Sequence, residues 1–335
     1  MAWPEATHSD SHLPKAMRGL RIPVVGSPLF IISGPELVIA QCKAGIIGSF
    51  PALNAREEKG EPPLLDAWLT QINEELDRHN QANPDTPAAP FAVNQIVHRS
   101  NGRLERDMEI CVKHKVPIWI TSLGARVEVN DAAHSCGGIV LHDIINNTFA
   151  KKAIQKGADG LIAVAAGAGG HAGPQSPFAL IQEIREWFDG PLLLSGAIAT
   201  GQAVLAARVM GADMGYIGSP FIATDEANAL QGYKDMIASA SAEDIMLSSL
   251  FTGVSGNYLR PSVVQAGMDP DNLPEASPDK MNFSDGSSKP KTWKEIWGAG
   301  QGIGAIKSVG STRALVDRIA AEYVAAGSRL SVEFK

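Results

Sequence analysis

The chain has 335 residues, of which 44% are hydrophobic and 19% charged, the composition of an ordinary globular protein with ample material for a core. Its formal net charge is -7 without any block of like charges, so we do not expect nucleic acid as a partner. No apolar run is long enough to cross a bilayer and no apolar leader stands at the N-terminus, so we expect neither a membrane span nor a signal peptide.

Residues 1–20 form a polar segment, and after it apolar runs alternate with helical patterns as far as residue 225. The clearest helix covers residues 64–80, where apolar side chains recur with a 3.6-residue period. This alternation predicts an α/β fold, and eight strands favour a (β/α)8 TIM barrel over a doubly wound parallel sheet. The expected strands cover residues 21–27, 46–50, 91–97, 117–123, 138–145, 161–166, 191–195 and 214–217.

The alternation stops after residue 225. We expect residues 226–299 to form a small, mainly helical domain that caps the substrate site, inserted before the C-terminal helix. The chain then returns to the barrel over residues 300–335, where a last helix is expected at 312–326. The barrel domain is therefore built from residues 21–225 and 300–335.

Several common types of site lack their sequence marks. The three cysteines, Cys42, Cys111 and Cys136, have no CxxC spacing, which indicates free thiols in the reducing cytoplasm. No glycine motif of a Rossmann dinucleotide site or a P-loop occurs. Only His171 and His142 lie at the C-termini of predicted strands, and neither has carboxylates at ligand spacing, so we expect no metal.

The stretch at residues 160–173, GLIAVAAGAGGHAG, runs from a buried strand into a glycine-dense turn that carries His171. Two more glycine turns follow the seventh and eighth strands, at Gly196 with Ala197 and at Gly218 with Ser219. In a parallel barrel these two loops are the usual place for a phosphate, held by backbone N–H groups at helix N-termini. We predict phosphate binding there; the alternative is that the glycines only make tight turns.

His171 is a candidate general base. Nothing in its loop is charged, so burial favours the neutral imidazole, although a structural or surface role is the alternative for a lone histidine. Asn94 lies in an apolar strand and needs a partner, either a flavin ring edge or an internal backbone bond. His142 ends the fifth strand and faces the same mouth of the barrel.

The segments PVVGSPLF, VNQI, AGGHAG, SGAIATG and MGYIGSPFIAT follow one another in this order, and IWGAGQGIG stands near the end. Together they resemble the nitronate monooxygenase family, also called 2-nitropropane dioxygenases. The resemblance implies a TIM barrel that binds FMN non-covalently and oxidises alkyl nitronates with O2 to a carbonyl compound and nitrite. It also implies that a small nitronate and O2 are the partners.

By position in this family, His171 matches the catalytic histidine. We expect it either to take the proton from the carbon next to the nitro group or to orient a nitronate that has already formed. One departure is the turn at Gly196 and Ala197, where the family has two glycines. We expect a phosphate site to tolerate this alanine only if its φ is negative. The predicted FMN contacts are Pro28, Leu29, Asn94, His142, Gly169, Gly170, Gly196, Ala197, Tyr216, Ile217, Gly218 and Ser219.

Two other functions fit the same pattern. An FMN oxidoreductase that uses NAD(P)H to reduce quinones or enoyl thioesters would share the glycine turns. Arg99 and Arg103 could then serve the nicotinamide phosphate, unless they lie on a solvated face. A flavin- or phosphate-binding protein without turnover would share the fold, and for every function we consider a homodimer.

Overall fold

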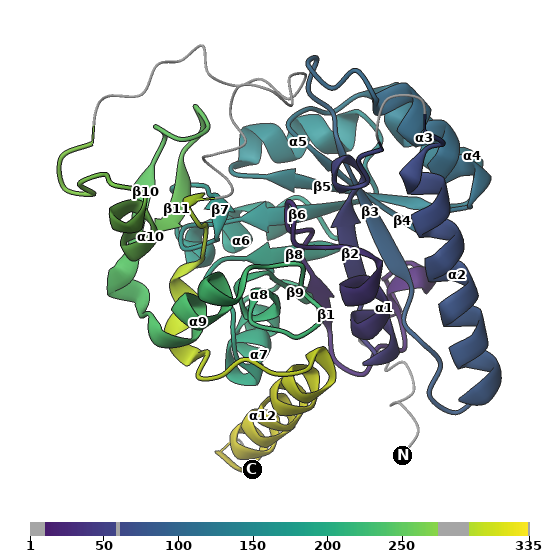
Figure 1. Cartoon of the computed structure of the whole chain (residues 1–335). Coiled ribbons are helices and arrows are strands. Elements are labelled where there is room, and N and C mark those ends of the chain that lie inside the picture. The colour runs from purple at the N-terminus through teal and green to yellow at the C-terminus, as the bar shows by residue number, and fades with distance from the viewer. Residues whose placement is uncertain (1–10, 58–60, 274–294, 334–335) are drawn as a thin grey trace.

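Eight parallel strands form a ring in the computed structural model, which describes residues 11–57, 61–273 and 295–333 (Figure 1). The strands pair in the order β1-β9-β8-β6-β5-β4-β3-β2, and a parallel bridge from Val25 to Ile47 closes the ring. The TIM barrel predicted from the alternation is therefore confirmed. The strands are β1 Val24–Gly26, β2 Gly48–Pro51, β3 Phe91–Ile96, β4 Ile118–Ser122, β5 Ile139–Ile144, β6 Gly160–Val164, β8 Leu192–Ser195 and β9 Met214–Ile217.

Helices cover the outside of the ring, each burying one apolar face against the strands. In α2 the side chains of Leu65, Leu69 and Ile72 are fully buried, which is the stripe that the sequence period predicted. The surrounding helices are α1 Pro35–Lys43, α2 Leu64–Ala82, α3 Leu104–Lys113, α4 Val127–Ser135, α5 Asn147–Gln155, α6 Pro177–Arg185, α7 Gly201–Val209 and the short α8 Ser219–Ile222, with a 3-10 turn η3 at Ala52–Asn54.

The inside of the barrel is filled by apolar side chains toward the N-terminal ends of the strands. Val25, Ile118 and Leu193 belong to this inner cluster, which Leu13 and Met17 close from below. Met17 lies in the 3-10 turn η2, Lys15–Met17, so the described part of the N-terminal segment seals the barrel floor. Polar groups are left for the opposite, C-terminal mouth.

The segment after α8 contains helices and also a β-hairpin. Its helices are α9 Gln231–Ser239, η4 Ala242–Asp244 and α10 Arg260–Gln265, and its strands are β10 Ile245–Ser248 and β11 Gly256–Leu259. Strand β11 also pairs antiparallel with β7, Gly170–His171, which gives a second sheet in the order β10-β11-β7. We call residues 226–273 the cap. The expected division into domains stays a prediction, because residues 274–294 lie outside the described chain.

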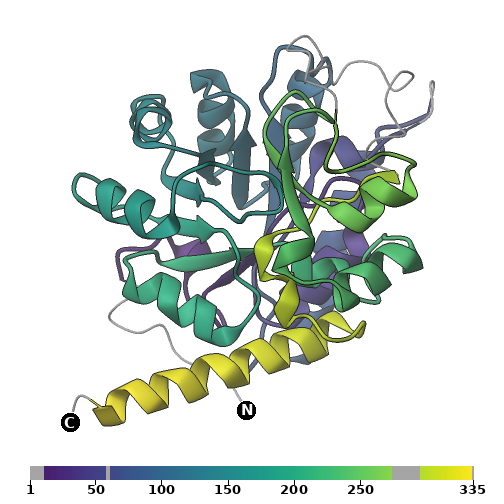
Figure 2. The ribbon, with the colours of Figure 1, turned by 90° about the vertical axis from the view of Figure 1, so that its left-hand side faces the viewer.

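The chain returns to the barrel through η6, Gln301–Ala305, and ends in α12, Thr312–Glu333. Figure 2 shows α12 lying along the outside of the barrel, where it packs on α7 and α1. The Gly201 N–H donates to Glu322 Oε2 at 2.8 Å, so this helix also satisfies the N-terminus of α7. Among the helices that the structure describes, none combines the length and the hydropathy needed to cross a bilayer.

Candidate active site

A cavity of about 1340 Å³ opens at the C-terminal mouth of the barrel. It extends from the strand ends to the cap, which contributes Phe251, Thr252 and Val254 to its lining. Pockets for small molecules usually measure about 300–1,000 Å³, so this cavity is larger than the usual range. The predicted site residues that line it are Pro28, Leu29, Asn94, His142, Gly169, Gly170, His171, Gly196, Ala197, Tyr216, Gly218 and Ser219.

Ile217 is the predicted residue that does not line this cavity. Successive side chains of a strand point to opposite faces, and on β9 it is Tyr216 that belongs to the inner cluster. Ile217 is fully buried in the outer layer between strands and helices, and its carbonyl oxygen accepts a hydrogen bond from Ser27 N at 2.8 Å. Its contribution is therefore to hold β1 beside β9.

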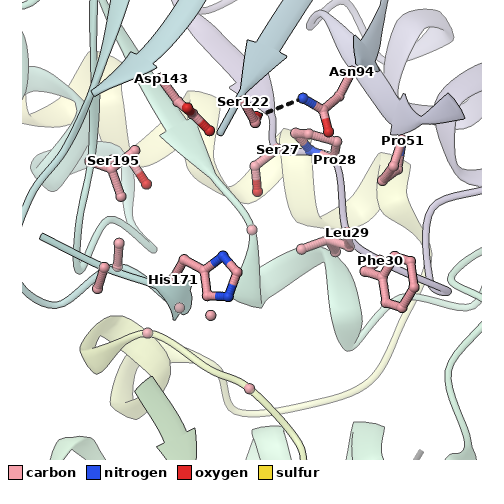
Figure 3. Close-up of a pocket in the computed structure, with 18 of the residues that line it drawn as sticks. Ser27, Pro28, Leu29, Phe30, Pro51, Asn94, Ser122, Asp143, His171 and Ser195 are labelled. Carbon is pink, nitrogen blue, oxygen red and sulfur yellow. Dashed lines mark hydrogen bonds between the residues drawn. The ribbon is translucent and has the colours of Figure 1, made fainter. Parts of the chain in front are cut away.

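His171 lies on β7, next to β11 of the cap, and lines the cavity (Figure 3). Its Nε2 is 3.1 Å from Thr252 Oγ1. Burial lowers the pKa of His171, because desolvation disfavours the charged imidazolium, so the ring is neutral near pH 7. The loop before it is fastened by the cap, since Asn257 Nδ2 donates to Ala168 O at 2.6 Å.

The glycines before His171 make room for the returning chain at residues 298–302. A Cβ on Gly169 would lie 2.7 Å from Gly300 N, and a Cβ on Gly300 would lie 2.7 Å from Gly167 O. A Cβ on Gly302 would likewise lie 2.8 Å from Ala197 O, in the turn after β8. The loop before His171 and the returning chain at residues 298–302 are both rich in glycine because their backbones are in direct contact.

The turn after β8 departs from our expectation. Ala197 has a φ of +54°, in the left-handed region, and not the negative φ expected from its side chain. Its N–H donates to Gly167 O at 3.2 Å, and this bond to the neighbouring loop supports a conformation that costs an alanine about 1–2 kcal/mol. Ala197 therefore does not offer its N–H to a phosphate.

Other N–H groups at the two turns have no such partner. Within the described chain, no protein acceptor is found for the N–H of Gly196 or of Gly218, which both line the cavity. Gly218 is the residue before α8, and the hydroxyl of Ser219 accepts from Gly300 N at 2.8 Å. Unpaired backbone donors at a cavity wall are the feature that an oxyanion needs.

Polar side chains from β3, β4 and β5 meet on another wall of the cavity (Figure 3). Asn94 Nδ2 donates to Ser122 Oγ at 2.8 Å and to Ile120 O at 3.3 Å, so the amide nitrogen has internal partners. From the described residues its Oδ1 accepts no hydrogen bond. This oxygen can therefore accept a further hydrogen bond.

Two titratable groups beside Asn94 have shifted pKa values. Burial raises the pKa of Asp143 to about 6, opposed by hydrogen bonds from Ser122 and the Leu123 backbone. Burial lowers the pKa of His142 to about 4, and its Nδ1 lies 2.6 Å from Thr121 Oγ1. Near pH 7 this wall thus carries a neutral imidazole and a carboxylate.

The basic residues considered in the sequence are placed differently from one another. Arg103 lines the cavity and its Nη2 donates to Asp107 Oδ1 at 3.2 Å, whereas Arg99 is not part of the lining. Arg56, which the sequence did not single out, lines the cavity with its guanidinium 5.3 Å from the centre of the Phe30 ring. No motif marks Arg56 or Thr252, because each reaches the cavity through a loop.

Within the described ranges, no group of three histidines, cysteines or carboxylates could hold a metal ion.

The family model for nitronate monooxygenase matches residues 13–322, nearly the whole chain. The chain belongs to the nitronate monooxygenase family. Members of this family are oxidoreductases and generally bind a flavin.

Individual relatives of this nitronate monooxygenase family member are distant. A curated relative from Rhodococcus jostii, the (3aS,4S,5R,7aS)-5-hydroxy-7a-methyl-1-oxo-octahydro-1H-indene-4-carboxyl-CoA dehydrogenase, is 23% identical over 74% of this chain and 65% of its own length. The nitroalkane oxidase of Streptomyces ansochromogenes superimposes with a TM-score of 0.71 at 22% identity, covering 93% and 98% of the two chains. FabK of Thermotoga maritima gives 0.72 at 20% identity, covering 94% and 96%. The two structures support the fold.

Proposed function

We propose that the protein is an FMN-dependent nitronate monooxygenase in which His171 is the catalytic base. The observation that carries the proposal is the cavity itself, which joins a neutral imidazole to two glycine turns with unpaired N–H groups. The cytoplasmic location indicated by the unpaired cysteines belongs to the proposal. Formation of a homodimer stays a prediction.

The residues present fit FMN. The N–H groups of Gly196 and Gly218 would hold the phosphate at the ends of β8 and β9, where a barrel usually binds it. Asn94 Oδ1 would accept from an N–H of the ring, which completes the hydrogen bonds of a buried amide. When bound, FMN supplies the acceptor that takes electrons from the nitronate and passes them to O2.

His171 would act on the substrate carbon. The C–H bond next to the nitro group breaks, its proton goes to the imidazole and its electron pair stays on the substrate as the nitronate. For the whole reaction, two nitronate anions and one O2 balance two carbonyl compounds and two nitrite anions. Leu29, Phe30 and Val164 give this part of the cavity apolar walls, which weaken the competition from water.

Nitrite release from propyl nitronate, without nicotinamide, is the direct test. We expect His171→Asn to lower kcat for neutral nitroalkanes by about 100- to 10,000-fold, the usual contribution of a general base. His134→Asn, which changes an exposed histidine paired with Asp159, is the matched control and should turn over normally. Full activity of His171→Asn toward neutral nitroalkanes would refute the assignment of the base. A purified protein without flavin absorbance would refute the proposal of FMN as the cofactor.

A second candidate is NAD(P)H-dependent reduction of quinones or enoyl thioesters at the same flavin. The observation in its favour is the size of the cavity together with the guanidinium groups of Arg56 and Arg103 in its lining. The Rhodococcus relative is named as acting on a CoA thioester, which carries phosphates that such groups bind. Anaerobic bleaching of the flavin by NADH would favour this function. Arg56→Met should then raise KM for the nucleotide, and Arg99→Met, outside the cavity, should not.

A further inference from the structure

The imidazole of His171 is in contact with a hydroxyl group that comes from the cap. Thr252 lies in the turn between β10 and β11, and its Oγ1 is 3.1 Å from His171 Nε2. The two residues are 81 positions apart in the sequence. The contact depends on the pairing of β11 with β7, in which Gly256 stands opposite His171.

The partners of the threonine hydroxyl decide which way this hydrogen bond runs. Thr252 Oγ1 also lies 3.1 Å from Val254 O, and a carbonyl oxygen can only accept. Thr252 Oγ1 is also 3.5 Å from Tyr258 Oη, a longer contact in which either oxygen can donate. When the single hydroxyl proton goes to Val254 O, the nearer of these two oxygens, the hydroxyl accepts from His171 and the Nε2 of His171 carries the proton.

This direction fixes the tautomer of the ring. Burial keeps His171 neutral, and a neutral imidazole has one protonated nitrogen and one with a lone pair. With the proton on Nε2, the lone pair is on Nδ1. Thr252 also remains an acceptor when the ring becomes an imidazolium, so the same contact stabilises the charged form that follows proton uptake.

We propose that Thr252 is a positioning residue that holds His171 in the Nε2–H tautomer, which makes Nδ1 the atom that receives the substrate proton. The inference rests on the proposed role of His171 as the base. It gives the cap a part in the chemistry, because the cap supplies the group that orients a side chain of the barrel.

The geometry around Thr252 is built to keep it in place. Val254 N lies 3.4 Å from Thr252 Oγ1, which closes the turn on the hydroxyl from a second side. A Cβ on Gly256 would lie 2.9 Å from Gly170 O, so only glycine lets β11 come this close to the loop that carries His171. Asn257 Nδ2 bonds Ala168 O in that same loop.

The test compares Thr252→Val, which removes the acceptor at nearly constant volume, with Thr252→Ser, which restores it. We expect Thr252→Val to lower kcat for neutral nitroalkanes by about two- to twelvefold, the effect of one neutral hydrogen bond, with KM little changed. Thr252→Ser should recover most of the rate. Ser249→Ala, in the same turn, is the control for a general disturbance of the cap.

A readout independent of turnover is the 15N spectrum of histidine-labelled protein, in which the His171 signals are those lost in His171→Asn. We expect a protonated Nε2 and an unprotonated Nδ1 in the wild type and in Thr252→Ser, and a mixture of tautomers in Thr252→Val. A protonated Nδ1 in the wild type would overturn the proposal, and so would a Thr252→Val protein with unchanged tautomer and kcat. If Thr252→Val does not fold, the wild-type spectrum and Thr252→Ala decide in the same way.

The two proposals fail differently. If His171→Asn retains full nitroalkane turnover, the assignment of the base is wrong, whatever the spectrum shows. If His171→Asn is inactive while the wild-type ring is protonated on Nδ1, the base stands and the role of Thr252 is wrong.

Discussion

Replacing Gly300 by alanine should displace the loop that carries His171 without changing the sequence of that loop. The added Cβ would lie 2.7 Å from Gly167 O and 3.0 Å from Gly169 N, whereas ordinary contact begins at 3.4 Å. One of the two backbones must therefore move by about 0.7 Å. The φ of Gly300 is -88°, which alanine adopts freely, so the effect is purely steric.

The magnitude follows from two opposing contributions to the free energy of unfolding. Overpacking costs about 1–3 kcal/mol, while the loss of glycine freedom in the unfolded chain returns about 0.4–1 kcal/mol. We expect Gly300→Ala to lower the free energy of unfolding by about 1–2 kcal/mol. Since a misplacement of 1 Å can cost about 100-fold in rate, kcat should fall by about tenfold or more.

Gly304→Ala is the matched control, because its Cβ would meet its nearest neighbour, Ser241 Cα, at 3.9 Å. It should keep kcat and raise the free energy of unfolding slightly. Urea unfolding, with the slope compared between variants, and steady-state nitrite release measure the two quantities. Equal stability and equal kcat in the two variants would refute the argument that the backbone contact positions His171.

Three further outcomes are expected. The pKa of His142 is about 4 in the folded protein against about 6.5 unfolded, so its stabilising contribution is present above pH 6.5 and is lost as the pH falls toward 4. Between pH 7 and pH 5, the free energy of unfolding of the wild type should fall by about 2 kcal/mol more than that of His142→Gln, as measured by urea titration. Equal losses in the two proteins would count against the burial argument. Asn257→Ala leaves Ala168 O without its donor, and should cost about 1–3 kcal/mol and speed amide exchange in the loop before His171; unchanged exchange would contradict this. In Gly201→Ala the added Cβ would overlap Tyr323 N in α12, so α12 should detach from the barrel before the barrel itself unfolds. Limited proteolysis should then cut within α12 only, and an uncut α12 would contradict this prediction.

Much of the site is readable in the sequence because its marks are local. A strand buried on both faces shows as a continuous apolar run, and the turn after it must contain residues that permit a close approach. His171 stands out because it interrupts such a turn, and the glycine turns ending at Gly196 and Gly218 stand out for the same reason. The order of these turns along the chain then places them at neighbouring strand ends, because a barrel connects its strands in sequence.

Other features depend on contacts between distant segments. The positive φ of Ala197 accompanies a hydrogen bond from its N–H to Gly167 O. Arg103, the N-cap residue of α3, lines the cavity and Arg99 does not. The sequence does not predict the hairpin of the cap, because β10 and β11 have four residues each, too few for an apolar alternation to be seen.

The sequence by itself determined the barrel, the glycine turns and the position of a histidine at the mouth, because strand burial and turn geometry leave marks on consecutive residues. Only the tertiary structure decided that β11 pairs with β7 and brings Thr252 to His171. The physical reason is that a strand edge offers the same backbone groups whatever its sequence, so its partner is chosen by the packing of the whole chain.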